Sequence, residues 1–235
     1  MWNKSSYLIL LLFAHFIFLG NCLVSNLFMG LSDRIKLAVT EKFGQSGVQR
    51  VIECWDNFSA GKVFEEKLDE VGEVVQKADC YISGLSAICF HDMKNHPWAL
   101  KIEPHYREIL SEVEMYDKKM QLSNNHWLSA RDSAGATYGP EWKTLGLQDR
   151  GVWEDSRLED FPQTMKLLEK YETPSVEVFF AKQNAMSGIK PHSDRNNFII
   201  TCHIGLDVPE GNKAWIQVGR DKYYWKVIGF IPKLM

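Results

Sequence analysis

Residues 176–225 read VEVFFAKQNAMSGIKPHSDRNNFIITCHIGLDVPEGNKAWIQVGRDKYYW, and this stretch decides the fold. Its most informative feature is the tetrapeptide Pro191-His192-Ser193-Asp194. Side chains two residues apart in an extended segment point the same way, so the His192 imidazole and the Asp194 carboxylate share a face. These groups are two of the three ligands in a two-histidine, one-carboxylate Fe(II) site. The sequence therefore predicts an iron site at His192 and Asp194, against the alternative of an ordinary surface or core histidine.

A second histidine, His203, follows in an apolar segment. Alternation along residues 198–206 places Cys202 and Ile204 on one, core-forming face and Thr201 and His203 on the other. Three roles stay open for His203: a metal ligand, a contact to a co-substrate, or a structural histidine bonded to its neighbours.

The same stretch resembles the aspartyl/asparaginyl β-hydroxylase family of 2-oxoglutarate-dependent oxygenases. The matching elements occur in the family's order: Ser187-Gly188, Pro191-His192, Asn197, His203-x-Gly205-Leu206, Val208-Pro209, Val218-Gly219 and Trp225.

This resemblance implies an α+β fold with a mainly β core, a double-stranded β-helix (a jelly-roll or cupin-like barrel) preceded by helices. It implies Fe(II), 2-oxoglutarate and O2 as reactants, and an Asp or Asn side chain of a protein, or a related small molecule, as substrate. His192 matches the family's first iron histidine, and His203 the histidine beside the oxo acid. We expect Thr201 and Asn197 to be further cofactor contacts.

Three departures from the family pattern bear on activity. Asp194 stands where the animal hydroxylases have glycine, and it would restore the commoner triad. Ile199 and Thr201 stand where the family has arginines, which removes cations that would bind a carboxylate. The family's second iron histidine lies in a later segment, and residues 226–235 contain no histidine. We therefore expect a C-terminally incomplete domain that binds iron weakly; the alternative is an inactive binding module or non-functional product.

Composition is compatible with one oxygenase domain behind a helical segment. The chain is 45% hydrophobic and 24% charged, with a net charge of −3. The absence of a basic run argues against a nucleic-acid partner. We expect a helical lead-in over residues 26–122 and the hydroxylase-like domain over 123–235. Apolar spacing predicts helices over 32–55, 64–75 and 106–120.

Residues 1–25 are predicted to be a signal peptide or signal anchor. Lys4 precedes an apolar run from Tyr7 to Gly20, which is short for a membrane span. We therefore expect the endoplasmic reticulum lumen or secretion, with membrane attachment only if the segment stays uncleaved as a single-pass anchor. Among the cysteines, Cys202 is predicted to be a buried free thiol rather than half of a disulfide.

Overall fold

The computed structural model describes residues 7–13, 30–67, 75–86, 88–120, 127–129, 137–138, 142–226 and 230–234. The chain divides into two compact units. Unit 1 comprises Met1–His15, Ile88–His192 and Ile199–Leu234; unit 2 comprises Phe16–Ala87, Ser193–Phe198 and Met235. The domain boundary expected near residue 123 stays a prediction.

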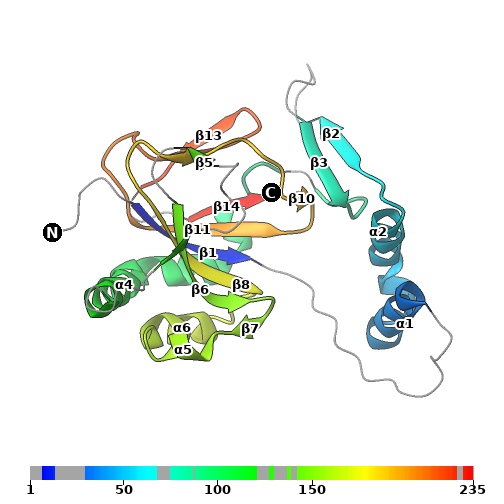
Figure 1. The fold of residues 1–235 in the computed structure, drawn as a ribbon, viewed down its shortest axis with the longest axis horizontal. Helices are drawn as coiled ribbons and strands as arrows, with labels where there is room; N and C mark the ends of the chain where they lie inside the picture. Colours follow the sequence, from blue (N-terminus) through cyan, green and yellow to red (C-terminus); the bar gives the residue numbers. More distant parts are fainter. Residues whose placement is uncertain are drawn as a thin grey trace. The chain divides into compact units, whose positions relative to one another are not determined.

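A seven-stranded sheet forms the centre of unit 1 within the described residues. Its order is β14-β11-β1-β8-β6-β4, with β7 paired to β6, and neighbouring strands are antiparallel. Figure 1 shows these strands side by side. The strands are β1 (Tyr7–Phe13), β4 (Leu128–Ser129), β6 (Trp142–Asp149), β7 (Val152–Trp153), β8 (Glu177–Gln183), β11 (Ile200–Asp207) and β14 (Phe230–Leu234).

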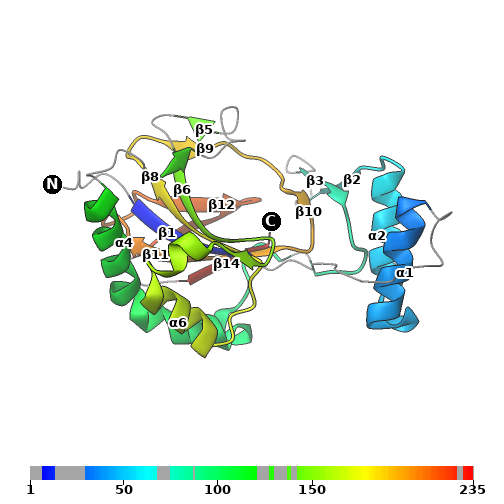
Figure 2. The same ribbon diagram turned by 60° about the horizontal axis from the view of Figure 1, so that its bottom comes forward.

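Helices cover one face of this sheet (Figure 2). The large core between the two layers contains Val113 of α4, Leu168 of α6 and Phe180 of β8. Phe161 fills its middle, with its ring centroid 5.0 Å from that of Phe180. The predicted helix over 106–120 is confirmed. The helical segments of unit 1 are η2 (Met93–Asn95), α3 (Pro97–Ile102), η3 (Glu103–His105), α4 (Tyr106–Met120), α5 (Asp155–Leu158) and α6 (Pro162–Lys170).

A smaller core lies on the opposite face of the sheet. Its buried members are Ala181, Val208, Ala214 and Trp225. The antiparallel hairpin of β12 (Trp215–Val218) and β13 (Asp221–Tyr224) contributes to this side, and β5 (Thr137–Tyr138) pairs with β9 (Gly188–Ile189). β11 is consequently buried on both faces, and the face assigned to Thr201 and His203 is also covered.

Unit 2 contains two helices and a three-stranded sheet of order β10-β3-β2. The predicted helix over 32–55 is confirmed, and the structure divides it into α1 (Leu31–Phe43), η1 (Gln45–Gly47) and α2 (Gln49–Ser59). The other elements are β2 (Phe64–Lys67), β3 (Val75–Cys80) and β10 (Arg195–Asn196).

The predicted helix over 64–75 is wrong. Phe64 and Val75 lie instead in the antiparallel strands β2 and β3. The Phe64 ring stacks on that of Tyr81, with centroids 4.6 Å apart, and this non-local contact favours the strand over the helical spacing. Leu68 and Val71, the other two apolar positions on which that helix was predicted, lie outside the described residues.

The fold is α+β, as predicted. The strands within the described ranges form no closed barrel. No helix in the described part of the chain is long and apolar enough to cross a membrane. Tyr7–Phe13, the first part of the apolar run predicted to target the chain, form β1 in this structure, and the remainder of that run lies outside the described residues.

Candidate functional site

His192 lies in the connection that follows β9 in unit 1. Residues 190–194 form no strand, so the predicted extended pair is not part of a β-ladder. The ring is exposed, and its Nδ1 lies 2.8 Å from the Lys190 backbone oxygen. A carbonyl at this distance favours the tautomer with the proton on Nδ1, because only a ring N–H can donate to it. In this tautomer Nε2 carries the ring lone pair, and it is the nitrogen through which such a histidine coordinates a metal.

Asp194 belongs to unit 2, where it begins a short segment held against β3. The Lys77 backbone N–H donates to Ser193 Oγ at 3.1 Å, and Asn196 Nδ2 donates to the Asp194 backbone oxygen at 3.1 Å. Arg195, with a positive φ of 66°, forms a two-point ion pair with Asp79 at 2.5 and 2.7 Å. These contacts fix the backbone on either side of the Asp194 side chain.

The side chain of Asn197 is used to hold a neighbouring backbone. Its Oδ1 accepts from the Ile82 N–H at 2.8 Å, and its Nδ2 donates to the Ile82 oxygen at 2.9 Å. Both polar groups of the amide therefore pair with one residue, as a strand partner would. The predicted role of Asn197 as a cofactor contact stays a prediction, and this geometry gives it a structural task.

His203 lies on β11 in unit 1 and is 8% exposed. Its ring stacks on the Trp225 indole, with centroids 5.8 Å apart and an interplanar angle of 29°. Thr201, two residues earlier on the same face, is fully buried. The predicted pairing of Thr201 and His203 on one face is thus present, and the indole packs against the imidazole.

Gly205 continues this face, and its lack of a side chain allows a close backbone approach. A Cβ atom there would lie 2.7 Å from the Lys226 backbone oxygen and 2.9 Å from Val208 Cγ2. Real Cβ atoms do not make contacts this short. The close approach brings the segment containing Trp225 over β11, beside His203.

Titratable groups lie on this strand and beside it. Burial raises the pKa of the Cys202 thiol far above its usual range, and Cys202 is a buried free thiol as predicted. Burial also raises the pKa of Asp207, and the Lys182 ammonium partly opposes this shift. The same lysine lies 3.4 Å from Asp117, whose other oxygen accepts from the Trp127 indole at 2.7 Å.

No cluster of three or more His, Cys, Asp or Glu side chains able to hold a metal occurs among the described residues. The His192 ring fits a ligand role through Nε2, whereas Asp194 belongs to the other unit. The described residues therefore fit a first ligand but assemble no complete triad.

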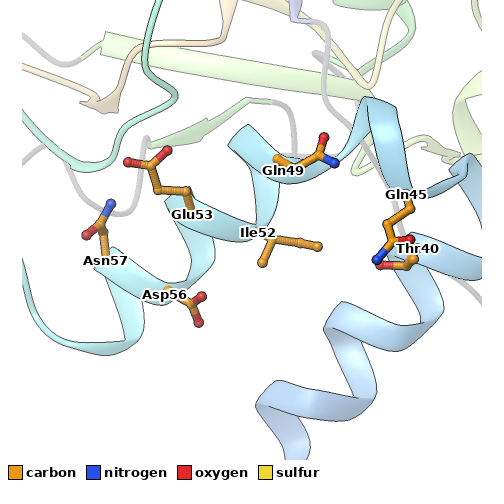
Figure 3. Close-up of a pocket in the computed structure, with 7 residues that line it drawn as sticks. All are labelled: Thr40, Gln45, Gln49, Ile52, Glu53, Asp56 and Asn57. Carbon is orange, nitrogen blue, oxygen red and sulfur yellow. The ribbon is translucent and has the colours of Figure 1, made fainter.

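A polar hollow of about 350 Å³ lies along α1, η1 and α2 in unit 2 (Figure 3). None of the predicted site residues lines it. Its lining consists of Thr40, Gln45, Gln49, Ile52, Glu53, Asp56 and Asn57, and Asp56 is already ion-paired with Lys36.

Comparison with known proteins places the chain among the hydroxylases. Residues 103–230, more than half of the chain, match the family described as aspartyl/asparaginyl β-hydroxylase, and the chain belongs to this family. The resemblance drawn from residues 176–225 is thereby confirmed. No curated protein matches the chain.

Two features of the site were missed in the sequence. The stacking of Trp225 on His203 and the tight contact at Gly205 both join positions far apart in the chain. Both residues were family-matching elements, so a signal for their importance was present. The spacing of the motif did not indicate that Trp225 contacts His203, or that the backbone at Lys226 lies against Gly205.

Proposed function

We propose that the chain has the fold and chemistry of an Fe(II)- and 2-oxoglutarate-dependent dioxygenase. The fold would be a double-stranded β-helix, of which unit 1 supplies the strands described above. The substrate would be an Asp or Asn side chain of a protein, or a related small molecule. Membership of the hydroxylase family carries this proposal, and the geometry of His192 and His203 supports it.

When bound, Fe(II) with 2-oxoglutarate would activate O2, placing one oxygen atom in succinate with loss of CO2 and inserting the other into a substrate C–H bond. His192 would bind the metal through Nε2, with its Nδ1–H held by the Lys190 carbonyl. Asp194 would be the second ligand. The third ligand that this chemistry needs is the family's second iron histidine, and the described residues contain no group of three donors.

The face of β11 would bind the oxo acid. His203, held by the Trp225 indole, would donate a hydrogen bond to a carboxylate, and the Thr201 hydroxyl would lie beside it. Neither side chain offers the two-pronged guanidinium of an arginine, so recognition of an acidic substrate would be weak from this strand alone. This favours a related substrate over the acidic side chains that arginines would recognise.

A second candidate function is a catalytically inactive family member that acts as a binding module. The lack of a three-donor cluster in the described ranges, together with Ile199 and Thr201 in place of arginines, favours this alternative. It predicts a stable fold without metal-dependent turnover.

The two candidates are separated by metal and oxo-acid binding. Calorimetric titration with Mn(II), as an air-stable substitute for Fe(II), should show weak binding that His192→Ala abolishes. His105→Ala is the matched control, because His105 already bonds Glu108 and Tyr171. His203→Ala should weaken 2-oxoglutarate binding and leave metal binding unchanged. Two outcomes would favour the inactive binding module: no metal binding by the unmodified chain, or equal metal binding by the unmodified chain and by His192→Ala.

A further inference from the structure

β1 lies in the middle of the unit 1 sheet, hydrogen-bonded to β8 on one side and to β11 on the other (Figures 1 and 2). Leu10 is in register with Phe180 of β8 and with Ile204 of β11. Both pairings are antiparallel, so β8 and β11 run parallel to each other with one strand between them. A strand between β8 and β11 can therefore run antiparallel to both of them at once, as β1 does.

The strands on both sides of this gap contribute buried residues to the cores on both faces of the sheet. In β8, Phe180 belongs to the core beneath the helices and Ala181 to the opposite core. In β11, Ile204 faces the first core, and His203 on the other face is buried against Trp225. A strand that is buried on both faces is expected to be continuously hydrophobic rather than alternating. The segment that occupies the gap reads YLILLLF.

The gap cannot be left empty without cost. Neighbouring strands lie about 4.8 Å apart, so β8 and β11 are separated by roughly 10 Å when one strand intervenes. Removing that strand leaves buried backbone N–H and C=O groups on the inner edges of both strands without partners. Direct pairing of β8 with β11 would pull Phe180 away from Phe161, whose ring centroid lies 5.0 Å away.

We propose that the gap between β8 and β11 is a strand-acceptor site for one apolar antiparallel strand, and that Tyr7–Phe13 of this chain is its occupant in the folded protein. Leu11 is in register with His203, so the occupant forms the ladder that fixes the backbone of this candidate oxo-acid contact. A targeting role and this structural role use the same residues, and cleavage behind residue 20 would vacate the site. The inference is independent of iron binding.

The test cuts the folded, full chain at a protease site introduced within residues 20–26. The N-terminal fragment should remain bound during size-exclusion chromatography. Hydrogen exchange should stay slow in residues 177–183 and 200–207. After the fragment has been removed in denaturant, exchange in these two segments should rise at least tenfold in the remaining chain. Adding back the fragment should restore protection.

Leu10→Pro removes a ladder N–H and should release the fragment from the cut chain at least tenfold faster. Asn3→Pro, which precedes residues 7–13 in the same fragment, is the matched control and should leave release unchanged. The release rates are compared in folded protein that has been cut but still holds its fragment, so the remaining chain does not have to refold. Prompt release of the unmodified fragment with both segments still protected would overturn the proposal. Protection retained in a fragment-free dimer would also overturn it, because a second copy would then supply the strand.

Discussion

The carboxylate of Glu112 on α4 caps the N-terminus of α6 through Thr164. Glu112 Oε2 accepts from the Thr164 N–H at 2.8 Å and from its hydroxyl at 2.7 Å, and Oε1 accepts from the Gln163 N–H at 2.6 Å. Both Glu112 and Thr164 are almost completely buried. α6 begins with Pro162 and has no side-chain cap of its own, so this contact supplies the acceptors that its first turn lacks.

We expect Glu112→Gln to destabilise unit 1 by about 2–4 kcal/mol, because an amide NH2 would face backbone donors and a charged acceptor would be lost. Urea unfolding followed by circular dichroism measures this free energy. Glu114→Gln, at a less buried position on the same helix, is the control and should change stability by no more than about 0.5 kcal/mol. Equal losses in both variants would show that Glu112 does not act through α6.

Gly205→Ala should destabilise the fold by about 1–3 kcal/mol, because the added Cβ would meet the Lys226 backbone oxygen, which cannot rotate away. Gly146→Ala on β6 is the matched control, since a Cβ there has no atom within 4 Å. Thermal unfolding of the two variants compares the same chemical change in two environments. A Gly205→Ala protein as stable as the control would mean that the segment after Trp225 is not held against β11.

Periodic segments were predictable from the sequence because the spacing of apolar residues within one segment already shows which of its faces is buried. Tyr106–Met120 forms a helix, as its apolar spacing indicates. The alternation along residues 198–206 also places Cys202 and Ile204 in the core beneath the helices, as expected. The candidate site was located through its motif, since His203 and Trp225 are both family-matching elements.

Non-local pairing was not predictable in the same way. The run Tyr7–Phe13 is apolar throughout, and such a run fits a targeting segment and a central strand equally well. Glu112 is an ordinary helical residue in sequence, and only the position of α6 makes it a cap. Asn197 likewise pairs with Ile82, 115 residues away along the chain, where no pattern links the two.

Stability should decline at alkaline pH through Cys202. Burial raises the pKa of its thiol in the folded state, whereas an unfolded cysteine titrates near 8.5. Above about pH 8.5 the unfolded state therefore loses a proton that the folded state retains, and each further pH unit costs about 1.4 kcal/mol. Urea midpoints should fall between pH 7.5 and 10. Cys202→Ala should reduce the slope of the unfolding free energy against pH by the contribution of one titrating group. An unchanged slope would contradict a protonated, buried thiol.

Native-state labelling gives an independent check on the same group. Iodoacetamide at pH 8 should modify the partly exposed Cys89 and leave Cys202 unmodified until denaturant is added, because the thiolate is the reactive form. Mass spectrometry of tryptic peptides reports both sites in one sample. Modification of Cys202 at the rate of Cys89 would show that β11 opens locally in the folded state.

The fate of the N-terminal segment connects compartment with fold. Expressed in a eukaryotic cell with a C-terminal tag and a glycosylation reporter, the chain should enter the secretory pathway, because a basic residue precedes the apolar run of residues 7–20. N-terminal sequencing of the folded, recovered protein should find Tyr7–Phe13 retained, since β8 and β11 both pair with this segment. Recovery without glycosylation would contradict targeting. A folded chain that starts after residue 20 would contradict a structural role for β1, and would leave its place between Phe180 and Ile204 to be filled by another strand.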